Sequence, residues 1–324
     1  PWRSLTDHLI AWDLPAPPGY RDTKARIFTT VDRRWEFVFS DPDATIDYRL
    51  LNWGGVRIDD RELGDPEPCR RGCIPSLDDP ALTDADGGRW YPDDAIVFGV
   101  EIDGDAVAFP KNIMEVHEMV NGTLGGRRFA MPYCTLCGSA QVFLTDTVDG
   151  VARPPVMRTS GLLSRSNKVM YDLDSQSVFD TFSGTAVSGP LRASGTVLPQ
   201  ATVVTTTWGD WRATHPDTRI VAEDGGIGRT YDADPLRGRD DNGPIFPIGQ
   251  VDDRLPTQAQ VVGVVGPDGT VVAFPVEGAR TALNADLPVE AAGVSLELEG
   301  QGLVATLGGE PVASHQAFWF AWSQ

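Results

Sequence analysis

The sequence contains no run of about 18 apolar residues, the length that a membrane-spanning helix requires. It is also poor in positive charge, with 27 Lys and Arg against 46 Asp and Glu and a formal net charge of −19. So acidic a chain repels nucleic-acid phosphates and anionic lipids alike. We therefore expect neither nucleic-acid binding nor membrane insertion.

Several well-known motifs are missing as well. The chain has no Gly-x-Ser-x-Gly elbow, no Walker loop, no dinucleotide fingerprint opening a helix and no His-Glu-x-x-His. The first residues, "PWRSLTDHLIAWDLPAPPGY", lack the basic start and the apolar stretch of a secretory signal. Either the chain is cytosolic, or it is a mature form without its leader.

Proline and glycine, by contrast, are abundant, with 25 and 34 residues. They separate short runs rich in Val, Ile, Phe and Thr, such as "AIVFGVEI" and "TVVAFPV", which are typical of strands between turns. Helical spacing is confined mainly to "KNIMEVHEMVNG", residues 111–122, which predicts a short helix ended by Gly122. We therefore expect a mainly β fold, a β-rich α+β class of short strands and hairpins with few helices.

One segment of the sequence is repeated. "VFGVEIDGDAVAFP" at 97–110 matches "VVGVVGPDGTVVAFP" at 261–275, and each predicts a strand, an Asp-Gly turn and a second strand. The match raises the hypothesis of two related halves. We divide the chain into an N-terminal segment 1–60, a core domain 61–222 and a C-terminal β segment 223–324, with the last as a degenerate repeat of the first half.

Only 4 cysteines are present, and they form two close pairs. Cys69 and Cys73 lie in "EPCRRGCIP", between prolines and with no histidine nearby, so we predict a local disulfide that closes a loop. Such a bond persists in an oxidising compartment. This predicts an extracytoplasmic protein, whether secreted, periplasmic or on the cell surface.

The second pair, Cys134 and Cys137 in "YCTLCGSA", has the spacing of a metal clamp or of a small redox disulfide. His117 is the one nearby candidate for a third ligand, with Glu118 beside it. Two thiolates and an imidazole suit Cu(I) or Zn(II), and the thioether of Met170 adds a weak soft ligand for copper. The competing interpretation is that His117 is an ordinary buried histidine and Met170 a core residue.

A thioredoxin-like arrangement would place the first cysteine at the start of a helix. Here "GSAQVFLTDTV" follows the pair, and its β-branched and aromatic residues are typical of a strand. This counts against the thioredoxin arrangement and leaves a disulfide switch open.

An ordered set of motifs between about residues 72 and 222, including "VAFPKNIMEVHEMVNG", "YCTLCGSAQVF" and "WGDWRATHPDTRIV", resembles the bacterial family catalogued as domain of unknown function 3179. The resemblance implies an exported or lipid-anchored protein with a metal site, and it assigns no reaction. This chain departs from the family pattern at Thr135, where relatives tend to carry proline, and in its Cys69 and Cys73 pair. The family's recurrent positions fall here on His117, Glu118, Cys134, Cys137, Gly138, Ser160, Gly161, Asn167, Met170, Tyr171, Asp172 and Gly184.

The resulting prediction is an exported protein with a mononuclear site of Cys134, Cys137 and His117, with Met170 or Glu118 as an auxiliary ligand. Copper is the expected metal and zinc the alternative. An oxidoreductase or a copper-handling protein follows, with a small-molecule substrate or a metal-transfer partner. Two alternatives stay open: a metal-free thiol–disulfide protein using Cys134 and Cys137, and a ligand-binding scaffold with a structural disulfide.

Overall fold

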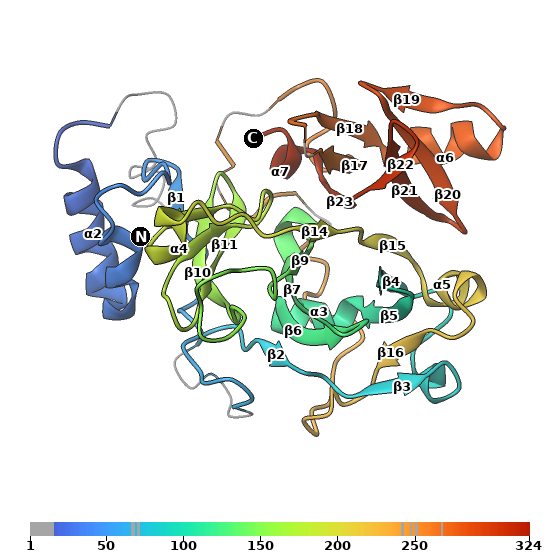
Figure 1. Ribbon diagram of the computed structural model, residues 1–324, viewed down its shortest axis with the longest axis horizontal. Coiled ribbons are helices and arrows are strands. Elements are labelled where there is room, and N and C mark those ends of the chain that lie inside the picture. The colour runs from blue at the N-terminus through green and yellow to red at the C-terminus, as the bar shows by residue number, and fades with distance from the viewer. Residues whose placement is uncertain are drawn as a thin grey trace.

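A computed structural model describes most of the chain (Figure 1). Its strands form five small sheets and its helices are short, so the prediction of a mainly β fold with few helices is confirmed. The expected N-terminal segment begins with residues 1–15, which lie outside the described residues. None of the described helices has the length and apolar character needed to cross a bilayer. The described residues are 16–65, 69, 72–240, 243–246, 248–249, 252–266 and 268–324.

The first sheet is antiparallel and contains, in spatial order, β1 (Leu51–Trp53), β10 (Met157–Ser164), β11 (Asn167–Asp172), β12 (Val178–Asp180) and β13 (Ala186–Ser188), with α4 (Pro190–Ala193) after β13. Helix α2 (Tyr20–Val31) and the 3-10 helix η1 (Arg33–Phe39) pack against it. The Trp35 indole donates a hydrogen bond to the Ser160 carbonyl at 2.7 Å. The N-terminal segment therefore shares a sheet and a hydrophobic cluster with the region that follows it.

The second sheet contains, in spatial order, β14 (Gln200–Ala201), β9 (Val142–Leu144), β7 (Arg127–Cys134), β6 (Met119–Leu124) and β2 (Leu77–Asp78), with β8 (Ser139–Ala140) paired to β7. Helix α3 (Lys111–His117) leads into it, so the helix predicted over 111–122 is right only for its first part. Glu118 adopts a left-handed φ of 52°, and the chain then enters β6. Gly122 lies inside this strand, where a Cβ would stand 2.9 Å from the Phe129 ring. Strand pairing thus overrides the helical spacing of the sequence.

The third sheet contains, in spatial order, β15 (Val204–Thr207), β4 (Ile96–Ile102), β5 (Asp105–Pro110), β16 (Arg219–Val221) and β3 (Leu82–Asp84), with the 3-10 helix η2 (Gly87–Trp90) after β3. Strands β4 and β5 form the first predicted hairpin, and its turn residues Asp103 and Gly104 have φ values of 50° and 82°. Helix α5 (Trp208–Thr214) follows β15. We call β4, β5, α3, β15 and α5 the first hairpin unit.

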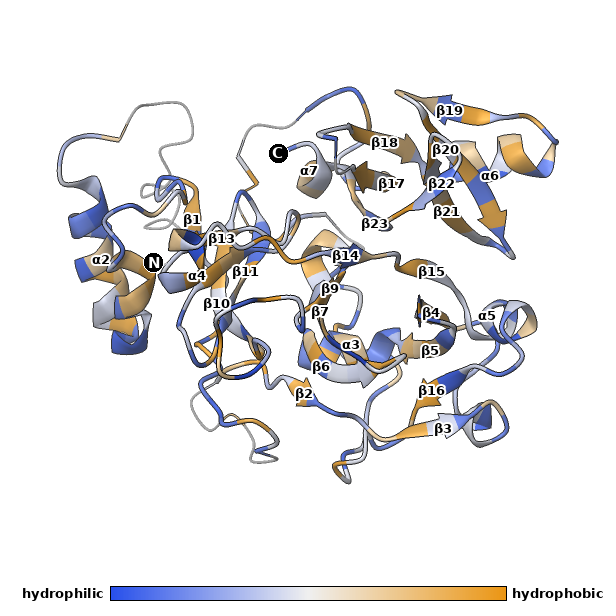
Figure 2. Ribbon diagram, viewed as in Figure 1, coloured by the Kyte–Doolittle hydropathy of each residue, from blue (hydrophilic) through white to orange (hydrophobic). Residues whose placement is uncertain are grey.

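The C-terminal part holds a sheet of β18 (Val271–Pro275), β17 (Gln260–Val265) and β23 (Ser314–Phe318), and a sheet of β19 (Val289–Ala291), β20 (Val294–Glu299), β21 (Gly302–Leu307) and β22 (Glu310–Val312). The second predicted hairpin, β17 and β18, runs into α6 (Val276–Asn284), and α7 (Trp319–Trp322) follows β23. We call β17, β18, α6, β23 and α7 the second hairpin unit. Figure 2 shows β17 and β18 as mainly hydrophobic, whereas α2 carries both hydrophilic and hydrophobic residues.

The two hairpin units repeat each other beyond the hairpin that the sequence reveals. In each, a glycine of the central strand is covered by a tryptophan from the helix after the third strand. A Cβ at Gly99 would lie 2.3 Å from the Trp211 ring, and one at Gly263 would lie 2.2 Å from the Trp322 ring. Two backbone hydrogen bonds are repeated as well: Trp208 N to Ala95 O at 2.9 Å, and Trp319 N to Ala259 O at 2.8 Å.

Candidate functional site

The Cys-x-x-Cys turn lies at the end of β7. Cys134 is the last residue of that strand, the 3-10 helix η3 (Thr135–Cys137) follows, and Gly138, with φ of 59°, lets the chain return as β8. Pairing of Cys134 with Ser139 closes the turn. The two sulfurs form a disulfide, one of the arrangements that the sequence analysis leaves open. Strands rather than a long helix follow it, as the sequence predicts.

The disulfide is covered by aromatic residues from the end of the chain. Its hydrophobic cluster includes Phe318 and Phe320, and a Cβ at Gly138 would lie 3.0 Å from the Phe318 ring. Cys137 is 0% exposed, with Sγ 3.1 Å from the carbonyl of Ser166, while Cys134 is 6% exposed. Cys134 also lines a cavity, so it is the more accessible of the two cysteines.

An ion pair between the buried Lys168 and the partly buried Glu118 lines the same cavity. Lys168 Nζ lies 2.6 Å from Glu118 Oε2, and Thr135 donates a hydrogen bond to Glu118 Oε1 at 2.9 Å. The Lys168 side chain is only 4% exposed. Burial lowers the pKa of Lys168, and the charge of Glu118 opposes that shift. The arrangement thus places a proton donor and a proton acceptor beside the cysteine turn.

His117 is occupied elsewhere. Its Nδ1 lies 2.6 Å from the carbonyl of Pro75 and its Nε2 lies 2.7 Å from the hydroxyl of Tyr231. Because a carbonyl only accepts, Nδ1 carries the proton and Nε2 accepts from Tyr231. Burial lowers the pKa of His117 to about 4. Among the described residues, His117 does not form a ligand cluster with Cys134 and Cys137.

The other predicted site residues support the fold locally. Met170 is 0% exposed within an apolar cluster that includes Met157 and Phe143. The three polar ones, Ser160, Asn167 and Asp172, form hydrogen bonds with backbone groups of neighbouring segments. Their hydrogen bonds are Ser160 Oγ to Val169 O, Asn167 Nδ2 to Ala321 O at 3.0 Å, and Val156 N to Asp172 Oδ1 at 2.9 Å.

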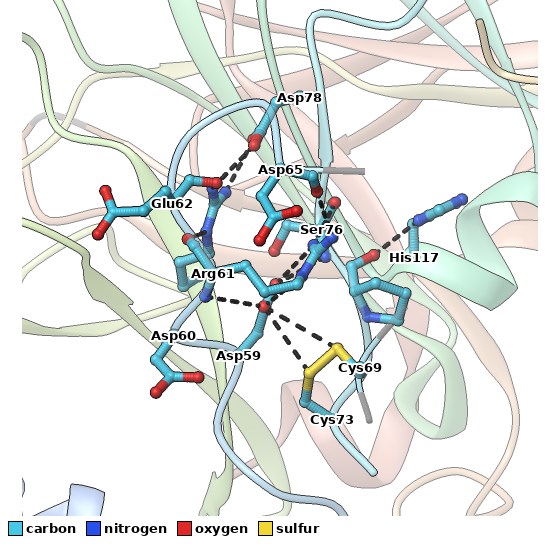
Figure 3. A network of polar contacts seen from close by, with 12 residues as sticks. Asp59, Asp60, Arg61, Glu62, Asp65, Cys69, Cys73, Ser76, Asp78 and His117 are labelled. Carbon is cyan, nitrogen blue, oxygen red and sulfur yellow. Dashed lines mark hydrogen bonds and ion pairs between the residues drawn. A yellow bond between two sulfur atoms is a disulfide. The ribbon is translucent and has the colours of Figure 1, made fainter. Parts of the chain in front are cut away.

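The first cysteine pair lies against a carboxylate that sequence reasoning missed (Figure 3). Cys69 and Cys73 form a disulfide, and their sulfurs lie 4.0 and 3.8 Å from Asp59 Oδ1. These three residues are the one group with the spacing of metal ligands in the described part of the chain. However, Asp59 already pairs with Arg61 at 2.7 Å and accepts from Ser76 N at 2.8 Å. Its contacts therefore favour anchoring of the loop, and nothing in the run "DDRELGD" distinguishes it from its acidic neighbours.

Comparisons with known proteins add one match. A family model described as "Protein of unknown function (DUF3179)" matches residues 71–292, which include the Cys-x-x-Cys turn and, in each hairpin unit, the hairpin and the helix that directly follows it, α3 or α6. No curated protein and no solved structure matches the chain.

Proposed function

The chain belongs to the DUF3179 family, and because that description names no activity, we propose its function from the geometry: an extracytoplasmic thiol–disulfide oxidoreductase that works through Cys134 and Cys137. The observation that carries the proposal is the cavity that Cys134 shares with the Glu118 and Lys168 pair. The compartment is inferred from the two disulfides, which last where the surroundings are oxidising.

The exchange begins with a thiolate of a partner dithiol. It attacks Cys134 Sγ, the sulfur at the cavity, and the bond to Cys137 breaks, so that Cys137 leaves as a thiolate and takes up a proton. The partner's second thiolate then attacks the partner's first sulfur in the mixed disulfide, and Cys134 leaves as a thiolate that also takes up a proton. Two electrons pass from the partner, which becomes a disulfide, to the cysteine pair, which becomes two thiols.

The ion pair assists by charge and by proton transfer. A lysine ammonium near the turn stabilises the negative charge of a departing or attacking thiolate. Because burial lowers the pKa of Lys168, its ammonium gives up a proton more readily than an exposed lysine does. Glu118 holds Lys168 in place and is linked to the turn through Thr135.

The test is reversible reduction of the native protein with a dithiol, followed by free-thiol counts and dithiol-dependent reduction of a disulfide substrate. Cys134→Ser should abolish the activity, and Lys168→Met should slow it and move its pH profile. The Cys69→Ser, Cys73→Ser double variant is the matched control and should keep the activity. A Cys134–Cys137 bond that resists mild reductant in the folded protein would contradict the proposal and favour a scaffold with a structural disulfide.

Copper handling is the second candidate, because the Cys-x-x-Cys turn holds both sulfurs together and, once reduced, would offer two thiolates to one soft ion. His117 would have to leave Pro75 and Tyr231 to join them. Metal content by mass spectrometry, on protein purified without chelator, decides between the two. Near-stoichiometric copper or zinc that is lost in Cys134→Ser would support the metal site, whereas a metal-free preparation with two reducible sulfurs would support the oxidoreductase.

A further inference from the structure

A second cavity lies where the two hairpin units and the cysteine turn meet. It encloses about 260 Å³, and Phe98, Val276 and Phe318 supply apolar parts of its wall. Gly138 contributes the side of the turn, and Thr135 lines both this cavity and the one beside the ion pair, whereas Cys134 lines only the latter. A ligand in the space between the units would therefore be separate from the accessible sulfur.

The cavity contains a cation without a counterion. Arg280 lines its wall, and its single hydrogen bond in the described residues is a weak one, from Nη2 to the carbonyl of Thr205 at 3.3 Å. Its buried Nε has no partner, and no carboxylate of the described residues forms an ion pair with it. Asp210 acts on it only through longer-range attraction. A partly buried guanidinium in this state is costly unless something pairs with it.

The first hairpin unit shows how the same position is neutralised. Glu115 is the fifth residue of α3 and Arg280 is the fifth residue of α6. Lys111, at the start of α3, pairs with Glu115 at 3.0 Å and with Asp240 at 2.9 Å. The corresponding first residue of α6 is Val276, which offers no charge. The second unit thus lacks the helix-internal ion pair that the first one has.

We propose that this cavity binds a small organic carboxylate, with its anionic group on Arg280 and its apolar body against Phe98 and Phe318. The nearby Lys111 does not compete for the ligand, because its ammonium is already paired with Glu115 and with Asp240, a carboxylate that also lines the cavity. A guanidinium matches the planar, bidentate geometry of a carboxylate, and the apolar wall favours an aromatic or aliphatic body over a bare anion.

The test is titration calorimetry on the full chain with benzoate, and with benzamide as a neutral probe of the same shape. Benzoate should bind saturably and benzamide at least tenfold more weakly. Arg280→Gln should weaken benzoate binding at least tenfold, while the exposed-arginine control Arg33→Gln should leave it unchanged. Benzoate binding that is absent, or equal in Arg280→Gln and the parent protein, would overturn the proposal.

A second variant keeps the test valid if Arg280→Gln unfolds. Val276→Glu places a carboxylate four residues before Arg280, as Lys111 lies four residues before Glu115, so Arg280 acquires an internal partner. It should weaken benzoate binding at least tenfold, and Val271→Glu, which adds the same charge at an exposed position of β18 outside the cavity, should not. Cys134→Ser should bind benzoate like the parent protein, because Cys134 does not line this cavity. Failure of the redox proposal and failure of the benzoate proposal can therefore be told apart. Equal binding by Val276→Glu and Val271→Glu would contradict the role of Arg280.

Discussion

The two hairpin units have the same backbone plan and different polar chemistry. Both place a tryptophan on a strand glycine, and in both the first residue of the helix after the third strand makes the same backbone hydrogen bond. The seventh residue of the helix, however, is His117 in α3 and Ala282 in α6. Conversely, the third-strand partner of the central glycine is Val204 in the first unit and His315 in the second. The repeated sequence therefore marks what the backbone needs, and the chemistry of each unit lies in the residues that differ.

The largest expected difference in stability between the two hairpin units concerns their tryptophans. Trp211 is 1% exposed and its indole bonds to Thr218 at 2.9 Å, whereas Trp322 is only partly buried. We expect Trp211→Ala to reduce the free energy of unfolding by about 3–5 kcal/mol and Trp322→Ala by roughly half as much. Urea unfolding of both variants measures this. Equal losses would mean that burial does not distinguish the two units.

Each hairpin unit contains one buried histidine, which should make the stability of the protein depend on pH. Burial lowers the pKa of His117 and of His315 from 6.5 to about 4. Between these values the unfolded chain binds protons that the folded protein does not. The contribution of each neutral histidine to the free energy of unfolding is therefore fully present above pH 6.5, the ordinary pKa. It decreases as the pH drops toward 4, by up to about 3 kcal/mol for each histidine.

Urea unfolding at several pH values checks the two histidines separately. His315→Val installs the residue that the first unit has at this position, and it should remove about half of the histidine-dependent loss. His117→Gln should remove the other half. An unchanged pH dependence in either variant would show that the histidine in question is not held neutral.

The smallest expected effect concerns the turns of the two hairpins. Gly104 and Gly269 have φ values of 82° and 87°, and a Cβ at either would meet nothing within 4 Å. Gly104→Ala and Gly269→Ala should each cost about 1 kcal/mol, from backbone strain alone. Thermal unfolding of the pair should show nearly equal shifts, and a clear difference between them would mean that the two turns are not equivalent.

The sequence predicts well those features that depend on neighbouring residues. Both hairpins follow from strand propensity and an Asp-Gly turn, and the approach of Cys134 to Cys137 follows from their spacing. The helix end at Gly122 was predicted wrongly because helical spacing continues there while β6 pairs with β7. Local preference decides an element only where no long-range pairing competes with it.

The contacts that define the candidate site could not be predicted from local sequence patterns, because they join residues that are far apart in the sequence. Lys168 meets Glu118 across 50 residues of sequence, and His117 meets Tyr231 across 114. The sequence predicts His117 as a metal ligand because histidine is a common ligand and because it lies near Cys134 and Cys137 in the sequence. Its partners in the structure are a carbonyl and a hydroxyl, and no sequence motif marks such contacts. Asp59 was missed for the same reason, because one acidic residue among many acquires its role only through packing.

The mainly β class, the two hairpins, the two cysteine pairs and the family can all be read from the amino-acid sequence, because each depends on short-range propensity or on residue spacing. Only the tertiary structure decided which buried charges meet and which are left alone. Lys168 finds Glu118 beside the cysteine turn, while Arg280 meets no carboxylate of the described residues in the cavity between the units. The physical reason is that burial strengthens electrostatic effects, and burial is set by how distant segments pack.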